Sequence, residues 1–304
     1  MPCSPSAPIL VDSKQPVHVL IPAHNRRAVT LECLNALNAA GDLGRYHVTV
    51  IDDGSTDGTA EAIRLSYPQI HVLTGDGNLW WTGAIVLGMR HAVEAGAEQL
   101  IWLNDDCLVR PRTLELLVEH TREHPRTIIG AQGVEANVST EVAFGGKRRS
   151  WRGFRFVRAA ADEVVACDVL SGNLVCMPRE VVDAIGYPDL KATPHYGGDA
   201  LYMVRARNAG YRLFVDGRTE VVGVSGERPL FPTEMLTAPG GPLRLLELTF
   251  QPRSGLAWRM WLHLYWEAYG VWGLVMWSKR QAEVVGATAL RFLPLRLRRR
   301  LAGH

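Results

Sequence analysis

Short runs of apolar and β-branched residues alternate with stretches of helical periodicity from Val17 onward. Strands are predicted at VHVLI, HVTVI, IHVLT and QLIWL, and helices start between them at about Arg27, Asp57 and Trp81. Because parallel neighbours need a crossover connection, this order predicts an α/β fold with a mostly parallel sheet flanked by helices. Such sheets bind ligands at the carboxyl ends of their strands, here the loops PAHNR, DDGSTDG, GDGN and NDDC.

The pattern changes after Asp106. A helix is predicted over PRTLELLVEHTREHP and a strand over TIIGAQGV. Residues 142–169 contain two adjacent glycines, a KRR triplet and the alternating WRGFRFV, which favour antiparallel strands. Helices are then predicted at PREVVDAIG and DALYMVRARNAG, and strands at YRLFVD and TEVVGV.

Beyond Gly226 the chain becomes rich in proline and glycine, which predicts a linker or loop. The following stretch, SGLAWRMWLHLYWEAYGVWGLVMWSKR, holds five of the nine tryptophans. Arg259, His263 and Glu267 interrupt it before about 20 apolar residues accumulate, so a membrane span is not expected. A helix lying in the membrane interface is predicted, with a helix packed on the main domain or a dimer contact as alternatives.

Composition narrows the class of protein. The 304 residues are 47% hydrophobic and 21% charged, the balance of a folded globular protein, and the formal charge of +2 gives no global sign of a nucleic-acid partner. The basic residues concentrate at the end of the chain, where a solvated terminus, an RNA tail or an arm on anionic lipid are the alternatives. These residues are Lys279, Arg280, Arg291, Arg296, Arg298, Arg299 and Arg300, against Glu283 alone.

The five cysteines form no C-x-x-C pair and are odd in number, so neither a disulfide framework nor a zinc site is indicated. The opening MPCSPSAPILVDSKQP has no charged start followed by an apolar run, and its prolines break any helix. We therefore expect reduced thiols, a flexible leader over residues 1–16, and a cytoplasmic protein.

Acidic residues end two of the predicted strands. Asn104, Asp105 and Asp106 follow QLIWL directly. The oxygens of adjacent carboxylates are suitable ligands for Mg²⁺ or Mn²⁺ beside a diphosphate. Asp52 and Asp53 end HVTVI, where a carboxylate can bind a nucleobase or a ribose hydroxyl. Each motif taken alone is also ordinary turn and cap chemistry.

The first loop supplies Pro22, Ala23 and Asn25 immediately before a helix, whose amino-terminal N–H groups favour a phosphate. Arg26 and Arg27 follow, although long basic side chains at a helix start more often face solvent. His24 is assigned no catalytic role.

The succession PAHNR, DDGSTD and NDD along neighbouring strands resembles the family 2 glycosyltransferases, which have the Rossmann-like GT-A fold. The resemblance covers roughly Val17 to Ser225. Within that family, GDGNLWWTGAIVLGMRHA is similar to rhamnosyltransferase-like members, in which an Asn and an aromatic, Gly-containing turn open the helix under the donor sugar. In this chain those residues are Asn78, Trp81 and Gly83.

The resemblance implies a role for each loop. Asp53 and Asp52 would contact the base, with Asn25 in the same pocket, and Asp106 would hold the divalent metal as the last acid of the family's D-x-D. The expected nucleotide-sugar site comprises Pro22, Ala23, Asn25, Asp52, Asp53, Asn78, Trp81, Gly83, Asn104, Asp105, Ser171, Gly172 and Asn173. Of these, the last three come from VLSGNLVCMP, which is similar to the family's small-residue segment before a helix.

Transfer to a hydroxyl needs a base that takes the proton as the new bond forms. Asp199 in TPHYGGDALYMVRARNAGY is the candidate, because two glycines before it let the backbone approach a sugar. The alternative is a plain helix cap. A single carboxylate on the acceptor side, with no second carboxylate nucleophile, implies single displacement with inversion.

The chain departs from the family pattern at three places. Asn104 stands where the first acid of the D-x-D is expected, and Gly198 replaces a Glu before the candidate base, while Arg205 keeps the family's helix Arg. Where many relatives carry a histidine as third metal ligand, this chain has Gly223, Val224 and Ser225.

The predicted organisation is a leader over 1–16, a GT-A catalytic domain over 17–226, and a linker with a Trp-rich, basic helical region over 227–304. Residues 17–110 would form the nucleotide-binding half and 111–226 the acceptor half. The expected activity is metal-dependent, inverting transfer of a sugar, with rhamnose on dTDP suggested by the WWTGA turn, to a glycan or lipid-linked acceptor at the inner face of the membrane. Alternatives are a small soluble acceptor, nucleotidyl transfer, and a non-catalytic nucleotide-sugar binder.

Overall fold

The computed structural model describes residues 14–135, 138–223 and 232–302, so most of the expected leader and the start of the expected linker lie outside it. The strands are β1 (Val17–Ala23), β2 (His47–Asp52), β3 (His71–Thr74), β4 (Gln99–Leu103), β5 (Cys107–Leu108), β6 (Thr127–Glu135), β7 (Val138–Phe144), β8 (Gly146–Ser150), β9 (Gly153–Phe156), β10 (Val164–Cys167), β11 (Val169–Leu170), β12 (Leu174–Pro178) and β13 (Arg212–Gly223). The helices are α1 (Arg27–Ala39), α2 (Asp42–Arg45), α3 (Thr59–Ser66), α4 (Trp80–Glu94), α5 (Thr113–Glu123), α6 (Glu180–Ile185), α7 (Gly198–Asn208), α8 (Pro232–Met235), α9 (Arg244–Phe250), α10 (Trp258–Tyr269), α11 (Val271–Leu290) and α12 (Leu295–Leu301).

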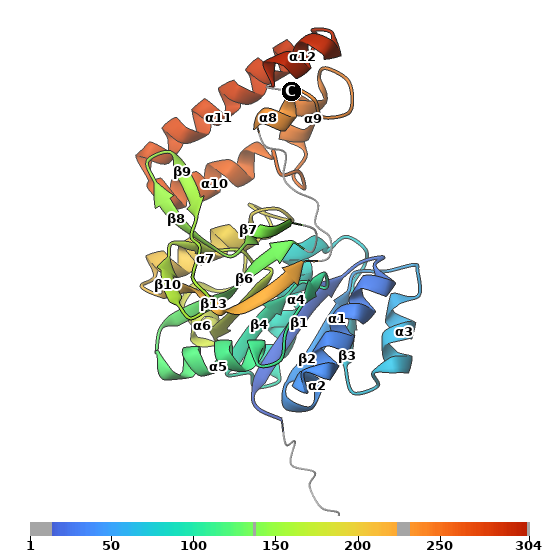
Figure 1. Ribbon diagram of the computed structural model, residues 1–304. Helices are drawn as coiled ribbons and strands as arrows, with labels where there is room; N and C mark the ends of the chain where they lie inside the picture. The colour runs from blue at the N-terminus through green and yellow to red at the C-terminus, as the bar shows by residue number, and fades with distance from the viewer. Residues whose placement is uncertain (1–13, 136–137, 224–231, 303–304) are drawn as a thin grey trace, which may run out of the picture.

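The expected α/β fold is confirmed. The main sheet runs in the order β10-β13-β6-β12-β4-β1-β2-β3, with β5 and β7 paired to β13 and β6 (Figure 1). The neighbours β4, β1, β2 and β3 are parallel, as the alternation of strands and helices predicts. Their carboxyl ends therefore open on one edge of the sheet.

The second half of the chain completes this sheet instead of building its own. β12 inserts between β4 and β6 and is antiparallel to both, while β13 lies parallel to β6. The two strands predicted at YRLFVD and TEVVGV form the single strand β13, which has an irregularity between Asp216 and Glu220. The predicted antiparallel region is present as β7 to β11, of which β8, β9 and β11 form a small second sheet.

Alternating side chains of the central strands fill two cores, one on each face of the sheet. Leu20 and Trp102 point to the face covered by α4 and α7, whereas Val19 and Ile101 point to the face covered by α1 and α5. All four are fully buried. This double burial explains why the central strands are almost continuously apolar in sequence.

Helices α8 to α12 form a separate layer beyond the carboxyl ends of the strands (Figure 1). The Trp-rich stretch is two helices, because Gly270 takes a left-handed φ of 58° and ends α10. Met260, Leu264 and Ala268 of α10 are buried in the same core as α7. Among the described residues, no helix is long and apolar enough to cross a membrane.

Candidate functional site

Asp53 holds the loop between β3 and α4 in place. One carboxylate oxygen accepts the backbone N–H of Gly77 at 2.8 Å and the other accepts that of Trp80 at 2.9 Å. Trp80 has a positive φ of 56°, a strained conformation for a bulky residue, and the bond to Asp53 stabilises it. Asp53 is thus a candidate for binding the nucleobase, and it also shapes the turn that precedes α4.

Asn25 ties the first loop to the second. Its side-chain oxygen accepts the N–H of Thr56 at 2.7 Å, and its own N–H donates to the Ser55 hydroxyl at 2.8 Å. Asp52, which is buried, accepts the N–H of Ser55 at 3.3 Å. The structure therefore brings the PAHNR and DDGSTDG loops together at the expected nucleotide edge.

Arg26, which the sequence placed at the start of the first helix, turns toward the acids that follow β4. Its guanidinium donates to Asp105 at 2.9 Å and to Asp106 at 3.0 Å, bridging the two carboxylates. Thr30 donates to the other oxygen of Asp105 at 3.0 Å. Both acids are buried, whereas the Arg26 side chain is 36% exposed and can reach a ligand at the sheet edge.

Burial shifts the pKa of Asp105. Desolvation raises its pKa to about 6, Arg26 opposes this rise, and the neighbouring carboxylate of Asp106 adds to it. Because Arg26 and Thr30 donate to its two oxygens, Asp105 is a structural partner of these residues more than a candidate metal ligand.

The residues fit a divalent metal only in part. Asp106 offers carboxylate oxygens of the kind that Mg²⁺ and Mn²⁺ prefer, although Arg26 holds one of them. Among the described residues, no group of three or more His, Cys, Asp or Glu side chains could hold a metal. Val224 and Ser225, two of the three positions where relatives place a histidine ligand, lie outside the described residues. A metal here would therefore need the donor diphosphate to complete its coordination.

Asn104 serves a different purpose from the acid it replaces. Its side-chain oxygen accepts the indole N–H of Trp81 at 2.8 Å, and its backbone N–H donates to the carbonyl of Asn173 at 2.8 Å. The Trp81 ring meets the buried Trp102 edge-on at 5.5 Å between centroids. Asn104 thus fixes the orientation of Trp81, a residue expected from the family resemblance to lie under the donor sugar.

Asp199 meets Gly172 across the site. Its Oδ2 accepts the backbone N–H of Gly172 at 2.7 Å. A Cβ on Gly172 would lie 2.7 Å from the Asp199 Cβ and 2.7 Å from the Trp81 ring, so only glycine permits this approach. The cap of α7 is Gly197, with no side-chain capping bond, so the helix-cap alternative for Asp199 does not apply. The structure brings Trp81, Asn104, Gly172 and Asp199 together.

Lys147 on β8 lies close enough to Asp199 for the carboxylate to influence the pKa of the lysine. Burial lowers the pKa of Lys147, and the Asp199 carboxylate acts against that shift. The ammonium group also lies 4.8 Å from the centre of the Phe156 ring. This cation, unnoticed in the sequence, adds positive charge beside the candidate base.

The remaining expected site residues have mainly structural contacts. Pro22 and Ala23 pair with Ile51 and Asp52 in the sheet, and Ser171 accepts the N–H of Gly145 at 3.4 Å. Gly83 is buried in the first turn of α4, where a Cβ would lie 3.1 Å from that of Leu79. Arg205 pairs with Asp189 at 3.4 Å and Glu267 at 3.2 Å and so fixes α7 to α10.

The layer of helices α8 to α12 also reaches the donor loop. The Arg253 guanidinium lies over the Trp80 ring at 4.3 Å and is 3.5 Å from the carbonyl of Asn78. The separation of 175 positions between Asn78 and Arg253 explains why no local sequence signal reveals this contact. Arg253 is therefore a further candidate for donor binding.

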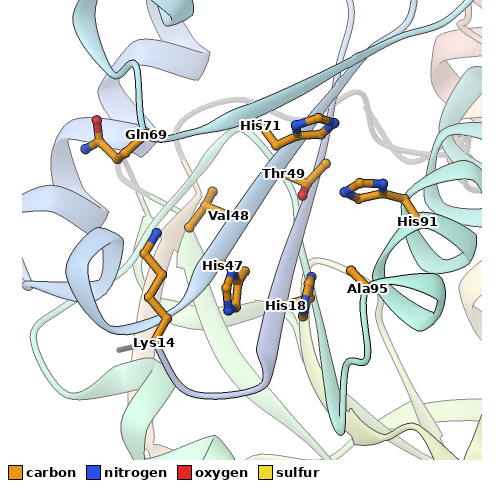
Figure 2. Close-up of a pocket in the computed structure, with 9 residues that line it drawn as sticks. All are labelled: Lys14, His18, His47, Val48, Thr49, Gln69, His71, His91 and Ala95. Atoms are coloured by element: carbon orange, nitrogen blue, oxygen red, sulfur yellow. The ribbon is translucent and has the colours of Figure 1, made fainter. Parts of the chain in front are cut away.

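A pocket lies at the opposite edge of the sheet (Figure 2). Its histidines form two stacked pairs, His18 with His47 at 4.7 Å and His71 with His91 at 4.5 Å between ring centroids. They come from the amino-terminal ends of β1, β2 and β3 and from α4. None of the expected site residues lines this pocket.

The fold and the loops at the carboxyl edge of the sheet are typical of sugar-transferring enzymes. Residues 18–185 match the family model described as Glycosyl transferase family 2, which covers more than half of the chain. The chain therefore belongs to glycosyltransferase family 2 and is a nucleotide-sugar-dependent glycosyltransferase of the GT-A fold. This membership sets aside nucleotidyl transfer.

Similar proteins include an archaeal relative, glycosyltransferase AglE of Haloferax volcanii, which is 28% identical over 230 residues that cover 70% of this chain and 67% of AglE. Mannosyltransferase PcManGT from Pyrobaculum calidifontis, in complex with GDP-Man and Mn²⁺, has a TM-score of 0.54 at 16% identity and covers 95% of this chain and 84% of its own. TarS from S. aureus, in complex with UDP-GlcNAc, has a TM-score of 0.52 at 15% identity, covering 90% and 81%. GalNAc-T7 with UDP, GalNAc and Mn²⁺ has a TM-score of 0.57 at 16% identity, and this chain spans only 44% of it.

Proposed function

We propose that the chain transfers a sugar, with inversion, from a nucleoside diphosphate donor to a hydroxyl group of a glycan or lipid-linked acceptor in cell-surface polysaccharide synthesis. The observation that supports this most is the meeting of Asp199 with Gly172 and Trp81. The Gly172 N–H orients one oxygen of Asp199, and the other, Oδ1, accepts no hydrogen bond from any described residue. That oxygen can take a proton from an acceptor hydroxyl.

Transfer then needs one displacement. The acceptor oxygen bonds to the anomeric carbon while its proton passes to Asp199, and the bond from that carbon to the diphosphate oxygen breaks with its electron pair. Arg26 lies beside Asp105 and Asp106, where its charge would favour the leaving diphosphate. Mg²⁺ or Mn²⁺, held by Asp106 and the diphosphate, would supply further neutralisation of the leaving group.

The donor would lie along the loops that Asn25 and Asp53 join. Asp52, Asp53 and Asn25 are proposed to bind the base and ribose, and Asn78 and Trp81 the sugar. The rhamnose and dTDP preference is an expectation from the WWTGA turn alone. The PcManGT and TarS structures contain GDP-Man and UDP-GlcNAc, so the fold accommodates several donors. A lipid-linked acceptor would place the enzyme at the cytoplasmic face of a membrane.

Asp199→Asn tests the proposed base. The amide has nearly the same shape but cannot take the proton, so we expect turnover to fall by roughly 10²–10⁴-fold while donor affinity stays within about twofold. Donor binding by calorimetry and product formation by mass spectrometry measure the two quantities. Asp183→Asn, at a carboxylate on α6 that is 59% exposed, is the matched control and should retain full turnover.

Near-normal turnover of Asp199→Asn would remove Asp199 from the mechanism. The anomeric configuration of the product, read by NMR, tests the displacement separately. A product that keeps the donor's configuration would contradict single displacement, whatever the result of the substitution.

A further inference from the structure

The outward side of α11 carries almost no charge. Only Lys279 and Glu283 are charged among its exposed residues, and they pair with each other at 3.0 Å. Ten further residues of α11 are exposed, and eight of them recur every three or four residues as a stripe along the 20-residue helix. All eight except Ser278 are apolar, and we call this set the apolar stripe. The members of this stripe are Val271, Leu274, Val275, Ser278, Ala282, Val285, Gly286 and Ala289. A helix face that met only water would be polar.

Arginines border one end of the stripe. Arg296, Arg299 and Arg300 on α12 are exposed, and within the described residues none of them forms an ion pair with a carboxylate. Arg291 and Arg298 hold α12 in place by donating to backbone carbonyls, including those of Met235 at 2.8 Å and Leu236 at 2.9 Å. The helix that carries the exposed arginines is therefore held in place just after the end of α11 and the exposed Phe292.

A second basic and aromatic group borders the other end. The turn between β8 and β9 presents Trp151, which is 67% exposed, with the Arg152 guanidinium 4.3 Å from its ring centre. The indole N–H of Trp272 donates to the carbonyl of Trp151 at 3.0 Å and so fixes this turn to the start of α11. Figure 1 shows β8 and β9 reaching the helical layer at this point.

We propose that the stripe on α11, together with the arginines at its two ends, docks on an anionic lipid bilayer. A bilayer surface offers apolar chains bordered by negative headgroups, which matches the order of charges on this face. RNA would suit the arginines but not the uncharged stripe. A second copy of the chain would bring arginines against arginines in either helix direction, because both ends are basic.

Two of the five tryptophans of the Trp-rich stretch make hydrogen bonds within the helical layer. The indole N–H groups of Trp261 and Trp277 donate to the carbonyls of Gly255 and Trp258 at 2.8 and 3.0 Å, and both rings are half-buried. The Trp277 bond joins α11 to α10, and the Trp261 bond closes the turn before α10, whereas Trp266 and Trp272 are about half exposed. The docking face thus belongs to α11 and α12, in the same helical layer as Arg253.

Sedimentation with lipid vesicles tests the proposal. We expect the full chain to sediment with vesicles of phosphatidylcholine containing about 30% phosphatidylglycerol, and weakly with phosphatidylcholine alone. Val275→Glu and Val285→Glu should each lower the bound fraction on anionic vesicles, and Arg296→Glu with Arg300→Glu should lower affinity at least about tenfold and flatten its salt dependence. All four residues are exposed, so the fold should tolerate these changes.

Leu65→Glu and Arg64→Glu are the matched controls, because both residues are exposed on α3. They should bind vesicles as the unaltered chain does. Equal binding by the α11 variants and the controls would overturn the proposal, as would no binding to anionic vesicles. A concentration-dependent dimer in analytical ultracentrifugation that Val285→Glu abolishes, or RNA binding lost in the arginine variant, would also overturn it. Donor affinity is measured in parallel, so a failure here is distinguishable from a failure of glycosyl transfer.

Discussion

The acids that follow β4 show how neighbours divide the work of similar side chains. Asp105 is held by Arg26 and Thr30 and has a pKa raised to about 6 by burial, whereas Asp106 accepts the other guanidinium N–H of Arg26 and the Cys107 thiol. The side-chain oxygen of Asn104 accepts a hydrogen bond from the indole N–H of Trp81. One loop thus contains a structural anchor, a candidate metal ligand and a hydrogen-bond acceptor that orients Trp81.

Arg26→Gln tests whether this arginine competes with a metal at Asp106. Removing the guanidinium leaves the carboxylate open to a cation, so we expect Mn²⁺ affinity without nucleotide to rise roughly two- to fivefold, the equivalent of a partly exposed ion pair. Titration followed by the electron paramagnetic resonance signal of free Mn²⁺ measures it. Arg27→Gln, at the exposed neighbouring position, is the control and should change nothing. Unchanged affinity in Arg26→Gln would exclude this competition.

Helices α10 and α11 illustrate how a single position decides the packing of two elements. At Gly273, a Cβ would lie 2.0 Å from the carbonyl oxygen of Tyr265, so the backbones of the two helices touch there. At Gly286, further along α11, no atom lies within 4 Å of the same position. Close packing therefore requires glycine at position 273, whereas position 286 has room for a larger side chain.

Gly273→Ala should destabilise the fold by roughly 1–3 kcal/mol, because the added methyl group forces the helices apart. Gly286→Ala is its matched control and should stabilise the helix by about 0.5–1 kcal/mol, since it lowers the entropy lost on folding. Urea unfolding followed by circular dichroism gives both values. Equal changes of the free energy of unfolding would contradict the close contact at Gly273.

At the scale of the whole molecule, the helical layer and the catalytic sheet act on one another through two contacts. Met260 of α10 packs against Gly197 at the start of α7, two residues before Asp199. Arg253 covers Trp80 at the donor loop. The layer thus borders both the candidate catalytic base and the loop expected to bind the donor.

Arg253→Ala should raise the donor dissociation constant roughly two- to fivefold, because the Trp80 turn loses an exposed cation–π contact worth about 0.5–1 kcal/mol. Calorimetric titration with the nucleotide sugar measures this change. Arg259→Ala on α10, exposed in the same layer, should leave donor binding unaltered. If the two variants bind donor equally, the helical layer does not take part in donor binding.

Much of the fold, and the edge of the sheet where the candidate site residues gather, could be predicted from the sequence. The alternation of short apolar runs with helical periodicity fixed the parallel strands, and Gly and Asp in the turns marked the loops at their carboxyl ends. These are short-range effects, since side-chain period and turn chemistry depend on residues a few positions apart. The α/β architecture and glycosyltransferase class expected from PAHNR, DDGSTD and NDD are confirmed.

Only the tertiary structure decided which partners these residues meet. It inserted β12 between β4 and β6, placed Arg26 across from acids 79 and 80 residues away, and set Arg253 against Trp80. It also showed that Asp199 bonds to Gly172 instead of capping its helix, and which side of α11 remains uncovered. Local sequence patterns state which side chains a face presents, whereas the choice of partner depends on packing between segments that are distant along the chain.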